Sequence, residues 1–99
     1  MHPYLSTIIG KGESKVLQLY GYLGEKTFTA KDGTPFKKYY YEFLDRSRKL
    51  IVHYATYYQH IHLQQIQEKT FVDVEHSQYK QNKFSFKETP KPLNWDSDF

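Results

Sequence analysis

An alternating run of apolar and polar residues followed by a sharp turn signal restricts this chain to a β-sheet fold. Residues 15–29 place leucines on one parity and tyrosines on the other, which is the period of two of a half-buried strand. Residues 31–35 then read Lys-Asp-Gly-Thr-Pro, where Asp-Gly favours a tight turn and proline cannot donate to a central ladder. The sequence therefore predicts a β-hairpin.

The second strand of this hairpin is expected over residues 36–44, which are rich in aromatic side chains. One parity holds Tyr39, Tyr41 and Phe43 and makes the better core face, because the other parity mixes rings with Lys38 and Glu42. Further strands are expected over residues 49–56, 70–75 and 83–87, and residues 57–69 are interpreted as a connection. Five short strands without a convincing long helix predict a small all-β barrel or sandwich.

Composition adds limits on size, compartment and partners. Ninety-nine residues form one domain, and 14 Lys and Arg against 11 Asp and Glu favour a polyanionic partner. The absence of cysteine excludes a disulfide scaffold and a thiolate metal site, and fits a reducing compartment. No secretory signal or membrane-spanning run is found, so a cytoplasmic location is expected.

The last residues differ from the rest of the chain in charge and in expected order. Residues 1–92 carry all 14 basic side chains, whereas the end of the chain carries acids beside aromatic rings. Pro90 and Pro92 interrupt any ladder, which divides the chain into a nucleic-acid-binding domain (residues 1–88) and a flexible linker with an acidic tip (residues 89–99). The tip is expected to stay off the fold and to bind partner proteins through Trp95, Asp96, Asp98 and Phe99.

Rings and cations alternate in the predicted domain in the way that single-stranded nucleic acid requires. Aromatic side chains make 18% of the chain, and unpaired bases stack on rings while lysine and arginine neutralise phosphates. Cross-strand or core packing is the competing explanation for any one of these tyrosines. The expected nucleic-acid-binding residues are Tyr20, Tyr22, Lys31, Phe36, Lys38, Tyr40, Arg46, Arg48, Lys49, Tyr79, Lys80 and Lys83.

Parts of the chain resemble known families. Residues 16–24, which end in Gly-Tyr-Leu-Gly, and the acidic tip that ends in phenylalanine resemble bacterial single-stranded-DNA-binding proteins. Residues 28–36, the strand up to residue 45, the Leu-Ile-Val-His run at 50–53 and the Tyr-Lys loop at 79–80 are similar to helix-destabilising proteins of filamentous phages.

The resemblance implies a five-stranded OB-fold barrel that coats single-stranded DNA without strong sequence preference, usually as a homodimer. It implies that Phe36 and Lys38 face DNA and that Tyr79 is the loop aromatic. A phage- or plasmid-encoded protein of DNA replication or recombination is expected, with replication or recombination proteins as partners of the tip, no enzyme activity and no cofactor.

Other functions remain open from the sequence. Exposed tyrosines could bind another protein, the same rings could stack on RNA, and a small nuclease could use His53 or His62 as a base with Glu75 as its partner. His60 and His62 could share a face toward a metal, but no third ligand is identified among residues such as His76 and Asp73.

The tip also suggests a regulatory hypothesis. Asp96 and Asp98 could occupy the basic groove when DNA is absent, and DNA would then displace them toward partners.

Overall fold

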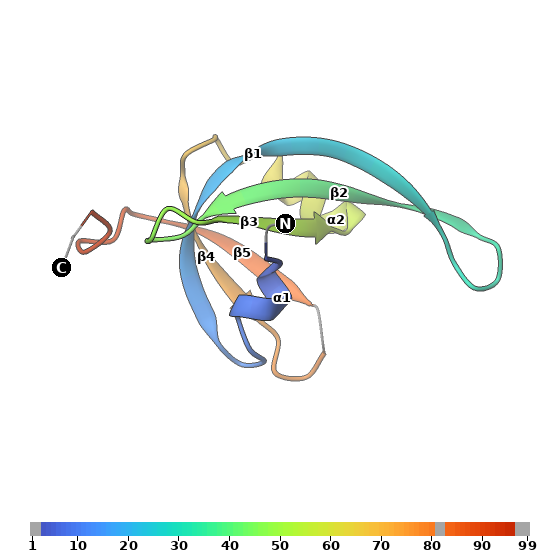
Figure 1. Cartoon of the computed structure of the whole chain (residues 1–99), viewed down its shortest axis with the longest axis horizontal. Helices are drawn as coiled ribbons and strands as arrows, with labels where there is room; N and C mark the ends of the chain where they lie inside the picture. The colour runs from blue at the N-terminus through green and yellow to red at the C-terminus, as the bar shows by residue number, and fades with distance from the viewer. Residues whose placement is uncertain (1–2, 81–82, 97–99) are drawn as a thin grey trace.

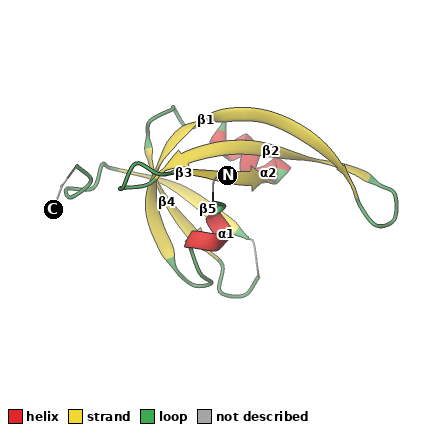
Figure 2. Cartoon of the chain, viewed as in Figure 1, coloured by secondary structure: helices red, strands yellow, loops and turns green. Residues whose placement is uncertain are grey.

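The structure, a computed structural model, describes residues 3–80 and 83–96 as five strands and two short helices (Figures 1 and 2). The strands are β1 (Ser14–Thr29), β2 (Pro35–Leu44), β3 (Leu50–Ala55), β4 (Phe71–His76) and β5 (Phe84–Thr89). Helix α1 spans Leu5–Ile8, and helix α2 spans Tyr57–Leu63. Neither helix in the described part of the chain has the length and apolar character needed to cross a membrane.

The five strands form one antiparallel sheet in the order β3-β2-β1-β4-β5. The all-β prediction and the five expected strands are confirmed, with ends that differ by one or two residues. The sheet is open rather than closed, since β3 and β5 are its two edges. Figure 1 shows the long β1 curving over the molecule so that both edge strands lie below it, an arrangement compatible with an OB-like architecture.

The core lies on the concave side of the sheet and follows the period of two. Tyr39, Tyr41 and Phe43 of β2 are buried, as their parity predicts, and the Phe43 ring stacks on Phe86 of β5 at 5.7 Å. The main core cluster also contains Leu5, Ile9, Leu17, Leu19, Ile51, Ala55, Leu63, Ile66, Val72, Val74 and Phe84.

The interpretation of residues 57–69 as a plain connection is wrong for its first half, which forms helix α2. Thr56 caps this helix: its side chain accepts from the backbone of Gln59, whose side chain in turn accepts from the Thr56 amide. This capping box starts a helix that lies beside the open edges of the sheet. The buried Leu63 then anchors the helix to the core.

The N-terminal segment covers the outer edge of β3. The Val52 amide donates to the Pro3 carbonyl at 2.9 Å, and Tyr4 pairs with Val52 as an isolated bridge. Helix α1 follows and buries Leu5. This segment therefore protects part of one unpaired edge of the sheet.

The prediction of a tip held off the fold is wrong for Trp95 and Asp96. Trp95 is 3% exposed, and its ring meets Phe71 edge-on at 4.8 Å. The Trp95 amide also donates to the Pro92 carbonyl, which turns the chain back after the prolines. Burial of a large indole outweighs the extending effect of these prolines. The other two tip residues, Asp98 and Phe99, lie outside the described residues.

Candidate nucleic-acid interface

The β1–β2 hairpin extends well past the other strands and forms an arm. Pairing of β2 with β3 begins at Tyr39 and Ala55, so residues 26–38 pair only with each other. Figure 1 shows this hairpin arm projecting from the sheet. Gly33 has φ 88° in the turn at its tip, where the Asp32 carboxylate accepts from the Thr34 amide at 2.9 Å. The arm carries its side chains on two faces, one of which continues as the convex face of the sheet.

An aromatic row runs along the convex face from the arm to β3. Phe28 and Phe36 are cross-strand partners and stack at 5.7 Å, and Tyr40 and Tyr54 are partners that stack at 4.2 Å. Phe28 and Tyr54 join the two pairs at 6.3 Å. Phe36 remains 41% exposed. We call Phe28, Phe36, Tyr40 and Tyr54 the outer aromatic row.

Tyr4 extends this row at the edge of β3. Its ring meets Tyr54 edge-on at 5.4 Å. The hydrogen bond with the Tyr54 side chain is the largest cause that raises the pKa of Tyr4. The N-terminal segment thus adds a fifth ring to the same surface.

Two lysines lie among these rings. Lys26 and Lys38 are direct cross-strand partners on the convex face, and the Lys26 ammonium is 5.7 Å from the Phe28 ring centroid. Like charges that face each other across a strand pair are destabilising. An anion such as a phosphate would relieve this repulsion, so the lysine pair favours a polyanionic ligand.

The row opens onto two grooves that meet at the edges of the sheet. The first, of about 290 Å³, lies beside Lys38, Tyr54 and Thr56 and reaches Phe84 of β5. The second, of about 610 Å³, lies between α2 and β5 and is lined by Tyr58, Lys80 and Lys83 among others. Thr56 and Phe84 line both grooves, so the two grooves are neighbours between the aromatic row and the β4–β5 loop. We call the row and these two grooves together the path.

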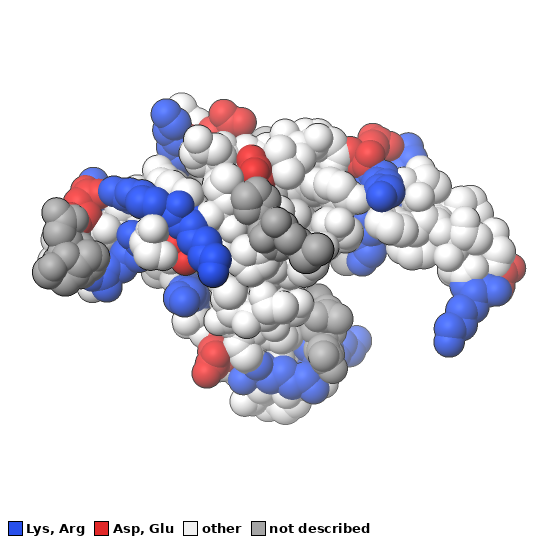
Figure 3. Space-filling model, viewed as in Figure 1, with Lys and Arg blue, Asp and Glu red and all other residues white. Residues whose placement is uncertain are grey.

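The structure places five of the predicted binding residues along this path. Phe36, Lys38 and Tyr40 lie on the convex face as their parity predicts, and Lys80 and Lys83 lie at the far groove. Lys31 lies at the exposed tip of the arm, within the Ala30–Thr34 turn. Figure 3 shows basic side chains at the tip of the arm and at the opposite end of the molecule.

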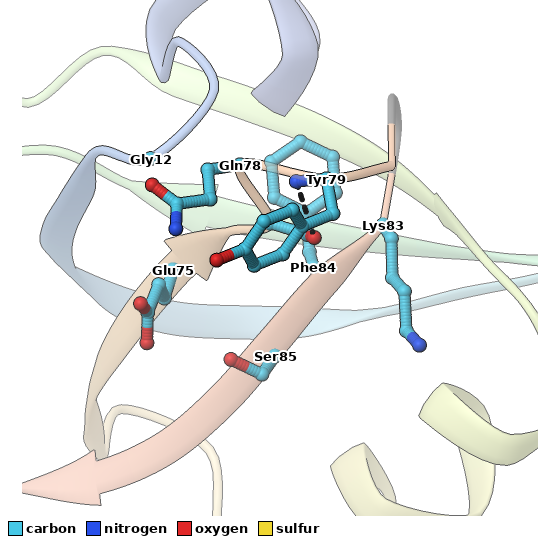
Figure 4. Close-up of a pocket in the computed structure, with 8 residues that line it drawn as sticks. Gly12, Glu75, Gln78, Tyr79, Lys83, Phe84 and Ser85 are labelled. Carbon is cyan, nitrogen blue, oxygen red and sulfur yellow. Dashed lines mark hydrogen bonds between the residues drawn. The ribbon is translucent and has the colours of Figure 1, made fainter.

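Tyr79 lies in the β4–β5 loop and lines a third pocket, of about 400 Å³, which Glu75 also lines (Figure 4). This pocket shares Lys83, Phe84 and Ser85 with the second groove. Its ring is 84% exposed, and its amide donates to Ser77. In Figure 4 the Lys83 side chain points away from Glu75. The carboxylate makes this pocket less suited to phosphate than the groove that Lys80 lines.

The prediction that Tyr20 and Tyr22 share one face is wrong, because Tyr22 lies on the core face, although its ring is still 45% exposed. The register with β2 shifts between Leu19 and Gly21, so the extra residue reverses the parity. Tyr22 therefore pairs with Tyr41, whose side chain belongs to the core face. Tyr20 is exposed at the bulge itself.

Arg46, Arg48 and Lys49 lie in the β2–β3 turn, at the other end of β2 from the arm. Arg48 forms an ion pair with Asp96 at 3.1 Å, and Lys91 contacts the same carboxylate. Lys91 and then Arg48 lower the pKa of Asp96 by hydrogen bonding. The structure thus separates this basic turn from the aromatic row and joins it to the end of the chain.

The histidines considered as ligands or bases contact the protein itself. His53 is buried, which lowers its pKa to about 4, and its Nε2 is 2.8 Å from the Gln59 side-chain oxygen. His62 Nε2 lies 2.7 Å from the Phe86 carbonyl. Among the residues that the structure describes, no group of three His, Asp or Glu side chains is placed to hold a metal ion.

Sequence reasoning missed Lys26, Phe28, Tyr54 and Tyr4. Two of them could have been found, because a tight turn at residues 31–35 makes Phe28 the cross-strand partner of Phe36 and Lys26 that of Lys38. Tyr4 could not, since its place beside Tyr54 depends on contacts far apart in the sequence.

The chain was compared with protein families, curated proteins and solved structures. No family model, curated protein or solved structure matches the chain.

Proposed function

We propose that this chain binds single-stranded DNA without sequence preference along the outer aromatic row and the grooves that continue it. The observation that carries the proposal is the pair of lysines, Lys26 and Lys38, held opposite each other among stacked rings. Rings offer stacking surfaces to unpaired bases, and paired cations attract the phosphates between them. This arrangement supports recognition of a flexible polyanion.

The proposed path offers rings at one end and lysines at the other. It starts at the exposed Phe36, follows β2 and β3, and reaches Lys80 and Lys83 through the two grooves. Aromatic rings stack on every base, so such a surface gives affinity without reading a sequence. A role in DNA replication or recombination, a phage or plasmid origin and a homodimeric state stay predictions from the sequence resemblance.

Recruitment of partner proteins by the tip also stays a proposal. The burial of Trp95 adds a cost to binding through this residue. A partner that uses the indole must first separate it from Phe71. We therefore infer that such a partner would bind more weakly than one that meets an exposed anchor.

The proposal is tested by titrating labelled poly-dT, duplex DNA and poly-U with the purified chain at two salt concentrations. We expect tighter binding to poly-dT than to the duplex, with affinity that falls linearly with salt on a log–log scale. Equal binding to single strands and duplex would contradict the proposal, and preference for poly-U would change the ligand to RNA.

A substitution in the outer aromatic row tests whether DNA binds there. Phe36→Ala removes an exposed ring and should weaken poly-dT binding about 5- to 150-fold, the range that corresponds to the ~1–3 kcal/mol of one stacked base. Tyr57→Ala is the matched control, because it removes an exposed ring of α2 that lines neither of the two grooves. Equal loss in both variants would argue against a site on the row.

A further inference from the structure

A pocket of about 320 Å³ lies on the other side of β1, between that strand and helix α2. Leu19, Leu63 and Ile66 form its apolar wall, and all three are buried members of the core. Binding pockets for small ligands span about 300–1,000 Å³, so this one is at the lower limit and suits a single side chain or a small molecule.

Two tyrosine rings form a second wall. Tyr22, which is 45% exposed, lies 5.0 Å from Tyr41, and both contact His60. The Tyr41 hydroxyl shares a hydrogen bond of 2.7 Å with His60 Nδ1, and burial raises the pKa of Tyr41 to about 12. The rings therefore present a fixed, neutral surface at physiological pH.

A carboxylate lies at the rim of this pocket. Glu68 lies so close to the β1 bulge that a Cβ added at Gly21 would be 3.4 Å from its Oε2. Within residues 3–80 and 83–96, the Glu68 side chain has neither a hydrogen bond nor an ion pair. Of the described residues that line the pocket, none is lysine or arginine, and the imidazole of His60 is hydrogen-bonded to Tyr41.

We propose that this pocket binds an organic cation carried on an aliphatic stem, such as the side chain of lysine or arginine or a free alkyl diamine. The stem would lie against Leu63 and Ile66, the cation would approach the face of Tyr22, and Glu68 would supply the opposite charge. This is the arrangement in which long basic side chains bury methylene groups and keep the charge near solvent.

Charge separates this pocket from the proposed DNA path. Glu68 would repel a phosphate, whereas Lys26 and Lys38 on the convex face attract one. The proposal therefore stands independently of DNA binding. The pocket beside α2 would take a cation, whereas the convex face would take the DNA polyanion.

The test is an NMR titration of the full chain, observed at the methyl groups of Leu19, Leu63 and Ile66. The probes are acetyl-lysine methylamide, its neutral isostere acetyl-norleucine methylamide, putrescine and a Gly-Gly-Arg-Gly-Gly peptide. We expect the cationic probes to shift these methyl signals while the norleucine compound shifts them several-fold less at equal concentration. Response to the peptide points to a protein partner, and response to putrescine alone points to a free diamine.

Glu68→Gln provides a second measurement and should weaken binding about 1.4- to 5-fold, the range of an exposed ion pair. Glu88→Gln is the matched control, because Glu88 is an exposed acid on β5 outside every groove described above. The isostere comparison uses the unmodified protein, so it does not depend on the folding of a variant. Equal shifts with the norleucine compound, no shifts with any cation, or stronger shifts with guanosine monophosphate would each overturn the proposal.

Discussion

The side-chain amide of Gln59 donates to the carbonyl oxygen of Phe84 at 2.9 Å and so ties helix α2 to the edge strand β5. The oxygen of the same amide is 2.8 Å from His53 Nε2 on β3. Because β3 and β5 share no ladder, this one side chain links the two edges of the open sheet. Gln59 takes the place of backbone hydrogen bonds that a closed barrel would have there.

Gln59→Ala should therefore destabilise the fold by about 1–3 kcal/mol, since it leaves polar groups of both edge strands without their partner. Thermal unfolding followed by circular dichroism measures the change. Gln67→Ala is the control, because Gln67 is exposed and should stay within about 0.5 kcal/mol of the parent. Similar stability of the two variants would show that the amide bridge contributes little.

Burial of His53 predicts a loss of stability in acid. Its pKa is about 4 in the folded state against 6.5 ordinarily, so the unfolded chain binds the proton first as pH falls. The stabilisation is present above pH 6.5, is lost as pH falls toward 4, and is on the order of 3 kcal/mol.

Urea unfolding of the parent and of His53→Gln at several pH values between 7 and 4 tests this dependence. The variant should lose less stability over that range, because glutamine does not titrate. Parallel curves for the two proteins would mean that other groups cause the acid sensitivity.

The lysine pair predicts opposite effects on binding and on stability. Lys26→Ala should lower the salt slope of poly-dT binding by about 0.7, the value for one phosphate contact with a single strand. It should also leave the free protein as stable as before or raise its stability by up to about 1 kcal/mol, because the repulsion with Lys38 is removed. Lys87→Ala, which removes an exposed lysine of β5, should change neither quantity. An unchanged salt slope for Lys26→Ala would place the phosphates elsewhere.

At the end of the chain, the charge of Asp96 and the packing of Trp95 can be tested by separate substitutions. Competition between the tip and DNA, as the sequence suggests it, requires DNA to reach the basic turn as well as the aromatic row. Asp96→Asn should then tighten DNA binding at low salt, because it releases Arg48 and Lys91 for this second contact. It should barely alter stability, since both ion pairs are exposed. Trp95→Ala should destabilise the fold by about 1–3 kcal/mol, because the indole is buried against Phe71.

Filter binding at low and at physiological salt measures the first effect, and thermal unfolding measures the second. Deletion of residues 93–99 would combine the two, so the single substitutions are the better test of competition between the tip and DNA. Unaltered affinity of Asp96→Asn would discard that competition.

Local pattern determined much of this fold before any contact was known. The alternation in β2 placed Tyr39, Tyr41 and Phe43 inside and Phe36, Lys38 and Tyr40 outside, because neighbouring side chains of a strand point to opposite faces. The Asp-Gly turn fixed the hairpin for the same local reason.

Tertiary structure decided what depends on distant contacts. The bulge before Gly21 moved Tyr22 to the core face, and packing on Phe71 held Trp95 against the domain in spite of the prolines. A strand's parity and a turn's backbone angles are properties of neighbouring residues. Gly21 and Gly24 indicate a bend or bulge from the sequence, and the register of β1 shifts at both. The face that each side chain takes after such a shift, the docking of a helix and the burial of a chain end depend on surfaces that exist only once the sheet has formed, so the sequence alone could not assign them.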